Sequence, residues 1–170
     1  MNVLFAYDGS TGADAAIAST ASLLGREEIH GVVATIWEPL LVQALRTERF
    51  GSPILALPLD ATAGDDLMEE HARQIAEHGA EVAREAGLAV RPLWISDRHD
   101  IAKAIVDAAT ELDVDLIVTG ARGLTGVRSL IGSVSRRVVQ DAHQPVLVVP
   151  TAKVDETTGR QLSAQAGSAD

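Results

Sequence analysis

The sequence contains no cysteine, few aromatic residues and too few basic residues to balance its acids. The absence of cysteine excludes disulfide bonds, thiolate metal sites and a cysteine nucleophile. With 24 acidic and 14 basic side chains the formal net charge is −10. A phosphate-rich polymer is repelled by such a field, so we expect no nucleic-acid partner. A small phosphorylated ligand stays compatible with this charge, because a loop of main-chain N–H groups can hold it locally.

The chain also lacks a hydrophobic run of the roughly 20 residues that a membrane-spanning helix needs. No basic region precedes the apolar stretch 2–7, as it would in a signal peptide. We therefore expect a cytoplasmic protein with no membrane partner. The 170 residues suffice for one domain with a full core, which we assign to residues 1–150. Residues 151–170 are polar with few apolar side chains and are expected to form a disordered tail.

What the chain does have is an alternation of short apolar runs with longer amphipathic segments. Because the strands are continuous apolar runs, both faces of their sheet need cover. The sequence therefore predicts an α/β fold, a doubly wound five-stranded parallel sheet with helices on both faces. The expected elements are strands at 2–7, 29–37, 89–95, 115–119 and 146–149, and helices at 11–24, 65–86, 100–112 and 133–143.

Residues 38–64 fit no single period and contain three prolines. We expect a long loop insertion here, with one short helical piece between Leu40 and Arg49. Loops of this length usually serve a function.

A glycine-rich segment follows the fourth expected strand. Glycine lets the main chain approach a ligand closely. Gly132 and Ser133 directly precede an expected helix, whose free N–H groups and dipole suit a phosphate. Ser133 can cap this helix and offer a hydroxyl group. The glycines and arginines of the segment are Gly120, Arg122, Gly123, Gly126, Arg128 and Gly132.

Spacing alone leaves open that these glycines only form a flexible turn. The segment is not a Walker P-loop, because no Gly-Lys-Ser/Thr occurs in it. It is also a poor Rossmann fingerprint, which should follow the first strand. The turn Asp8–Ser10 should meet the segment at the carboxyl edge of the sheet. We expect Asp8 to contact the ligand and not to act as a phosphoacceptor, since no set of acidic and basic partners stands out around it.

Taken together, four segments resemble the ATP-binding branch of the universal stress protein family. The resemblance covers residues 1–150 in order and implies a Rossmann-like fold of the adenine nucleotide alpha hydrolase-like kind. The segments are Val-Leu-Phe-Ala-Tyr-Asp-Gly-Ser at 3–10, Asp-Leu-Ile-Val-Thr-Gly-Ala-Arg-Gly at 115–123, Gly-Ser-Val-Ser-Arg-Arg-Val at 132–138 and Gln-Pro-Val-Leu-Val-Val-Pro at 144–150.

The resemblance implies a site for ATP, with or without Mg²⁺, or for a related adenine nucleotide. In it Asp8 touches the nucleoside, Ile36 lines the adenine, and the loop glycines with Ser133 and Val134 cradle the phosphates. The resemblance also implies a homodimer, formed by antiparallel pairing of strand 146–149 with its copy. The implied binding residues are Ala6, Tyr7, Asp8, Ile36, Gly120, Arg122, Gly123, Gly132, Ser133 and Val134.

The chain departs from the family pattern at two places. Gly123 and Gly132 enclose eight residues, one fewer than the family has. The segment Ser96–Asp100 replaces the Gly-Asp-Pro that commonly precedes the third helix. Two functions therefore stay open: a nucleotide-dependent homodimeric stress-response regulator, and a same-fold interaction protein whose shortened loop no longer binds nucleotide. A weak ATP hydrolase is less well supported, because no placed general base or metal–carboxylate cluster is evident.

Overall fold

The computed structural model describes residues 1–25, 29–39, 61–97, 100–121 and 131–150. Over these ranges the chain forms one five-stranded parallel sheet in the order β3-β2-β1-β4-β5, which confirms the expected α/β fold. The strands are β1 (Asn2–Ala6), β2 (His30–Trp37), β3 (Ala89–Ser96), β4 (Leu116–Gly120) and β5 (Val146–Val149). The helices are α1 (Thr11–Leu24), α3 (Ala61–Glu85), α4 (Ile101–Glu111) and α5 (Ser133–Asp141).

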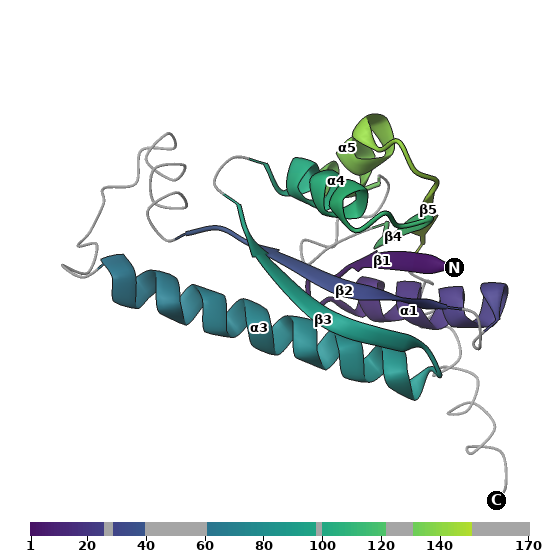
Figure 1. Cartoon of the computed structure of the whole chain (residues 1–170), viewed down its shortest axis with the longest axis horizontal. Coiled ribbons are helices and arrows are strands. Elements are labelled where there is room, and N and C mark those ends of the chain that lie inside the picture. Colours follow the sequence, from purple (N-terminus) through teal and green to yellow (C-terminus); the bar gives the residue numbers. More distant parts are fainter. Residues whose placement is uncertain (26–28, 40–60, 98–99, 122–130, 151–170) are drawn as a thin grey trace, which may run out of the picture.

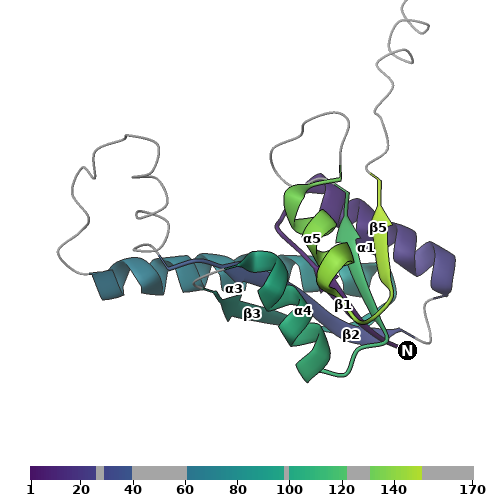
Figure 2. The same cartoon turned by 90° about the horizontal axis from the view of Figure 1, so that it is seen from above.

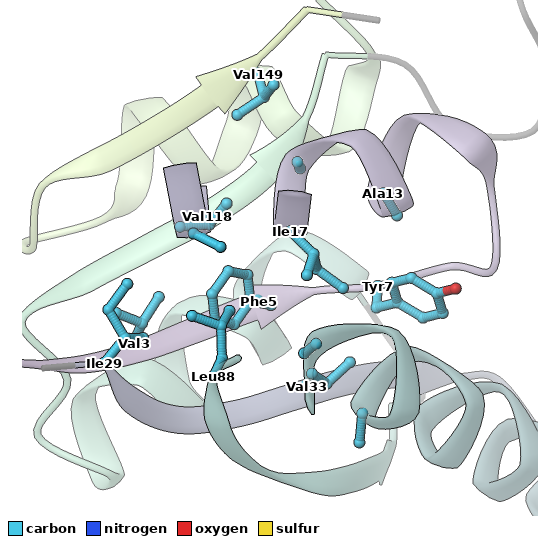
Figure 3. Close-up of a cluster of buried hydrophobic side chains, with 14 residues drawn as sticks. Val3, Phe5, Tyr7, Ala13, Ile17, Ile29, Val33, Leu88, Val118 and Val149 are labelled. Carbon is cyan, nitrogen blue, oxygen red and sulfur yellow. The ribbon is translucent and has the colours of Figure 1, made fainter. Parts of the chain in front are cut away.

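Helices cover both faces of the sheet (Figure 1). Helices α1 and α3 lie on one face, over a core that includes Val3 and Phe5 (Figure 3). Helices α4 and α5 lie on the other face, over a core that includes Leu4 and Ile117. Successive side chains of a strand point to opposite faces, so a strand buried on both sides reads as a continuous apolar run. The apolar runs of the sequence have this cause.

The strand order contains a reversal that positions the site. From β1 the chain moves outward through β2 to β3, and then crosses to β4 and β5 on the other side of β1. The reversal lies between β1 and β4, where Ala6 is in register with Thr119. In open α/β sheets, ligands bind beyond the carboxyl ends of the strands at such a switch point.

One predicted boundary is wrong. Helix α3 begins at Ala61, so residues 61–64 belong to the helix and not to the expected loop 38–64. The helix thus begins about one turn earlier than predicted, although only Ala61 and Ala63 among the added residues are strong helix formers. Residues 40–60, with the expected short helical piece, and the expected tail 151–170 lie outside the described residues.

Helix α3 meets β1 through an interlocking contact between Tyr7 and Gly79. The Tyr7 side chain is buried, with 4% of the residue's surface exposed. Its ring occupies the space beside Gly79 so closely that an added Cβ there would lie 2.6 Å from Cδ1 of the ring. A glycine in the middle of a long helix is otherwise unfavourable. The ring therefore explains why α3 tolerates a glycine at this point.

This contact predicts the sign of a substitution. Replacing a helical glycine by alanine ordinarily stabilises a protein by about 1 kcal/mol. Overpacking in a core destabilises by about 1–3 kcal/mol, so we expect Gly79→Ala to lower the free energy of unfolding, measured by urea denaturation. In a Tyr7→Ala background, where the ring is absent, the same substitution should be neutral or stabilising. A Gly79→Ala protein more stable than the wild type would contradict the contact.

Candidate functional site

A cavity of about 250 Å³ opens at the carboxyl ends of β1 and β4, at the switch point of the sheet. Its apolar wall comes mainly from β2, α4 and α5, and its polar part from the ends of β1 and β4 and the starts of α1 and α5. The apolar side chains are Ala6, Ala13, Ala34, Ile36, Ile101, Ile105 and Val134, and Tyr7 also lines the cavity. The polar side chains are Asp8, Ser10, Thr119, Ser133 and Ser135.

The structure brings the described members of the predicted site together. They come from β1 and the turn after it, from β2, from the end of β4 and from the start of α5, and all of them line the cavity. Arg122 and Gly123, also predicted, lie outside the described residues. The predicted site residues that line the cavity are Ala6, Tyr7, Asp8, Ile36, Gly120, Gly132, Ser133 and Val134. That these residues bind nucleotide stays a prediction.

Asp8 is held in place by its own turn. Its Oδ1 accepts a hydrogen bond from the main-chain N–H of Ser10 at 3.0 Å. Gly9 takes a φ of 76°, which favours glycine, and lets the turn close. Ser10 in turn caps α1, since its Oγ accepts from the N–H of Ala13 at 3.2 Å. Within the described parts of the chain, Oδ2 of the exposed Asp8 has no hydrogen-bond partner, so it is available to a ligand.

Tyr7 anchors the strand end that carries Asp8. Its hydroxyl donates to Oδ1 of Asp14 at 2.6 Å, its N–H donates to the carbonyl oxygen of Ala34 at 2.9 Å, and its own carbonyl oxygen accepts from Oγ1 of Thr35 at 3.1 Å. Burial and the hydrogen bond to Asp14 raise the pKa of the Tyr7 phenol well above its usual range. The phenol and both polar main-chain groups of Tyr7 are thus engaged within the protein.

Gly120 has a structural reason for being glycine that is independent of any ligand. A Cβ added there would lie 2.9 Å from the main-chain carbon and oxygen of Gly12 in the first turn of α1. The end of β4 thus packs directly on the backbone of α1. The sequence pattern had suggested only a close approach to phosphate, because the partner Gly12 belongs to a distant segment.

The two helices that start at the cavity on the α4 and α5 face differ in their caps. Helix α4 is closed by Asp100, whose Oδ1 accepts from the N–H groups of Ala102 at 3.0 Å and Lys103 at 3.4 Å. Asp100 also pairs with Arg137 of α5. Thus Ser96–Asp100, where the chain departs from the family pattern, supplies a side-chain cap to α4.

Helix α5 begins without a side-chain cap. Ser133, which we had expected as a candidate cap, is its first helical residue, and the cap position is taken by Gly132. The first main-chain bond of the helix runs from the N–H of Arg136 to the carbonyl oxygen of Gly132 at 2.9 Å. The N–H groups of the preceding turn therefore have no partner inside the helix. With the helix dipole, such an end has the chemistry that suits an anion.

Sequence reasoning missed several lining residues. Two of them, Ile101 and Ile105, lie on the apolar stripe of α4. Their position in the first half of this helix, close to the carboxyl edge of the sheet, could have indicated that they line the cavity. Thr119 is a polar residue at the end of an apolar strand, which is a weaker signal, and Ser135 lies in a polar stretch that gave no signal. The missed residues are Ser10, Ala13, Ala34, Ile101, Ile105, Thr119 and Ser135.

The described ranges contain no group of three or more histidine, aspartate or glutamate side chains that could hold a metal ion. Asp8 is the one carboxylate that lines the cavity in these ranges. Among the helices in these ranges, none combines the length and apolar character of a transmembrane span.

The sheet order and the cavity at its switch point define the class of doubly wound α/β proteins that take small ligands at the carboxyl edge of the sheet. Within this class, the chain belongs to the universal stress protein family, whose family model matches residues 1–150. The family resemblance of the sequence is thereby confirmed.

Relatives and a solved structure agree with this assignment. A universal stress protein of Thermus aquaticus is 34% identical over 153 residues, which are 86% of this chain and 96% of that protein. One of Methanocaldococcus jannaschii is 34% identical over 105 residues, 60% of this chain but only 61% of the relative's own length. The structure of an Arabidopsis thaliana universal stress family protein with AMP bound has a TM-score of 0.59 at 19% identity, covering 92% of this chain and 95% of that one.

The buried phenol gives a pH-dependent prediction. The folded state raises the pKa of Tyr7 above its ordinary value of 10.0, so the neutral phenol favours folding. This contribution is complete below about pH 10 and is lost as the pH rises toward the folded-state pKa. Tyr7 is the only tyrosine, so phenolate absorbance reports it alone. We expect no phenolate in the folded protein about one unit above the ordinary pKa, whereas the urea-unfolded chain should be ionised there.

A Tyr7→Phe variant supplies the blank for this titration and should lose less stability between neutral and alkaline pH. Burial is the larger cause of the shift, so Asp14→Ala should lower the pKa of Tyr7 only in part. Phenolate at its ordinary pH in a protein that circular dichroism shows to be folded would contradict the buried position.

Proposed function

We propose that this chain is an ATP-binding regulatory protein that acts as a nucleotide-dependent homodimer in a stress response. The observation that carries the proposal is the uncapped first turn of α5, which faces the same cavity as the carboxylate of Asp8. AMP in the Arabidopsis thaliana family structure supports an adenine nucleotide as the ligand. The proposal includes a cytoplasmic location, because its ligand is a cytoplasmic nucleotide, and Mg²⁺ as a companion of the phosphates.

The chemistry of the cavity suits the parts of a nucleotide. Ile36, Ile101 and Ile105 provide an apolar wall of the kind that takes an adenine ring. Asp8 can accept hydrogen bonds from sugar hydroxyl groups, and its charge would repel phosphate. The start of α5 suits the phosphate end, where Arg122 and Gly123 are expected to add contacts.

The shortened glycine loop does not favour the alternative of an interaction protein without a ligand. Both ends of the loop are attached to the sheet edge independently of its length. The N–H of Gly132 donates to the carbonyl oxygen of Ala121 at 2.6 Å, and the N–H of Ala121 donates to that of Val149 at 2.7 Å. The one-residue difference thus falls between two attached ends.

A binding role for Asp8 gives a direct test. Losing a hydrogen bond to a charged acceptor costs about 1.5–3 kcal/mol, or roughly ten- to a hundredfold in affinity. We expect Asp8→Ala to weaken ATP binding by this factor in titration calorimetry while the fold is kept. The matched control is Asp66→Ala, which removes an exposed carboxylate that does not line the cavity.

If ATP turnover is detectable, its rate at saturating ATP should change little in Asp8→Ala, because the proposal gives Asp8 no chemical step. Unchanged affinity with abolished turnover would instead point to an enzyme. A wild-type protein that binds no adenine nucleotide would end the proposal.

The homodimer part of the proposal rests on a difference between the two edge strands, β3 and β5. The N–H groups of Ala89 and Asp97 point to β2, so the alternation along a parallel strand turns position 92 to the open edge. Pro92 stands there and offers no N–H, which protects that edge from pairing. On β5, the carbonyl groups of residues 145 and 149 point to β4, so those of residues 146 and 148 face the open edge unprotected.

Helix α5 adds an exposed apolar side chain beside the β5 edge. Val139 is 49% exposed. Arg137 faces α4 through its pair with Asp100, so Val139, two residues later and about 200° around the helix, lies on the opposite flank. Figure 2 shows α5 alongside β4, with β5 beyond it at the edge of the sheet. Apolar exposure at this place supports the β5 edge as the interface.

The edge assignment predicts the effect of two substitutions on assembly. Val148→Pro should leave the β4 ladder intact and remove an outward N–H, as Pro92 does on β3, so we expect a folded monomer by light scattering at micromolar concentration. Val139→Lys should also weaken the dimer, whereas Gln140→Lys, on the exposed outer side of the same helix, should not. A monomeric wild type, or a Val148→Pro protein that stays folded and dimeric, would rule out this interface.

A further inference from the structure

Two buried hydroxyl groups fasten the start of α5 to the end of β4. Thr119 is 6% exposed and Ser135 is 5% exposed, and both line the cavity. Oγ of Ser135 donates to the carbonyl oxygen of Gly120 at 2.8 Å. Oγ1 of Thr119 lies 3.0 Å from Oγ of Ser135 and 3.2 Å from the same carbonyl oxygen. The three residues form a closed hydrogen-bond network in the wall of the cavity.

The protons of both hydroxyl groups are used in hydrogen bonds within the protein. The proton of Ser135 goes to Gly120, and that of Thr119 goes to Ser135 or Gly120. Neither hydroxyl therefore has a proton left for an anion in the cavity. Because an anion needs donors, these two hydroxyl groups can affect its binding only through the neighbouring groups that they hold in place.

The neighbours that the network places are the uncapped N–H groups of α5. Ser135 is the third residue of the helix, and the Gly132 N–H, just before the helix, is bound to Ala121. The first turn of α5 is thus attached at one end to Gly120, the last residue of β4, and at the other to Ala121, which follows it. This fixes the direction of the N–H groups of Ser133 and Val134 relative to Asp8 across the cavity.

We propose that Ser135 and Thr119 are positioning residues for the phosphate group of the ligand: they hold the first turn of α5 so that its N–H groups converge on one anion position. This inference rests on the proposed nucleotide-binding function and adds which residues set the strength of its phosphate contact. It assigns no ligand contact to either hydroxyl.

The test separates the phosphate contact from the rest of the ligand. Adenosine and AMP share the base and the sugar, so the ratio of their dissociation constants, measured by titration calorimetry, reports the phosphate alone. We expect Ser135→Ala and Thr119→Val to reduce this ratio about tenfold, the scale of one hydrogen bond to a charged group, and to change adenosine affinity less than twofold. Thr119→Ser keeps the hydroxyl and should keep the ratio near the wild-type value.

Thr20→Val is the matched control. Thr20 is 0% exposed, and its Oγ1 donates to the carbonyl oxygen of Ala16 at 2.7 Å, within α1 and away from the cavity lining. Its loss should lower stability in a similar way but leave the ratio unchanged.

The outcomes distinguish this inference from the function on which it rests. A wild type that prefers AMP to adenosine, with an unchanged ratio in both Ser135→Ala and Thr119→Val, overturns the inference and leaves the proposed function standing. Equal losses for adenosine and AMP also overturn it, because they indicate a general disturbance of the cavity. A wild type that binds neither compound overturns both. If Ser135→Ala does not fold, the comparison of Thr119→Val with Thr119→Ser decides alone.

Discussion

The parallel pairing of β1 with β4 is the contact on which the rest of the structure depends. It joins the two halves of the sheet, and it aligns Ala6 with Thr119 at the point where the chain leaves the two strands toward different faces. The turn with Asp8 leads to α1, and the other segment leads to α5 on the opposite face. A cavity remains between them because neither segment can fill the space in which the two diverge.

The helices that begin at this cavity differ in whether a side chain caps the N–H groups of their first turn. The side chain of Ser10 accepts from one N–H group at the start of α1 and that of Asp100 from two at the start of α4, so two of the three helices that begin here have a side-chain cap. Only α5, among these three, begins without a side-chain cap. Such an end is unfavourable unless water or a ligand meets it. The first turn without a side-chain cap therefore lies at one place, and Asp8 is the one carboxylate among the described residues that line the same cavity.

The fold and much of the cavity lining could be predicted from the sequence, for a physical reason. Strands buried on both faces leave unbroken apolar runs, and Asp8 and Gly132 directly adjoin regular elements, so topology alone brings them to one edge. The contact of Tyr7 with Gly79, the packing of Gly120 on Gly12 and the bond from Ser135 to Gly120 could not be predicted. Each joins segments that are distant in the sequence, and periodicity carries no information about such partners.

Pro92 on β3 has a consequence for the size that assemblies can reach. An edge strand that pairs antiparallel with its own copy creates a two-fold axis, and the interface is then the same patch on both subunits. In a pair formed in this way, both β5 edges are buried in the interface. The two edges that stay open are the β3 strands, where Pro92 offers no N–H to a further strand. Growth by strand addition thus ends in a closed assembly of defined size. The same aliphatic sheet with two open edges could elongate into a fibre.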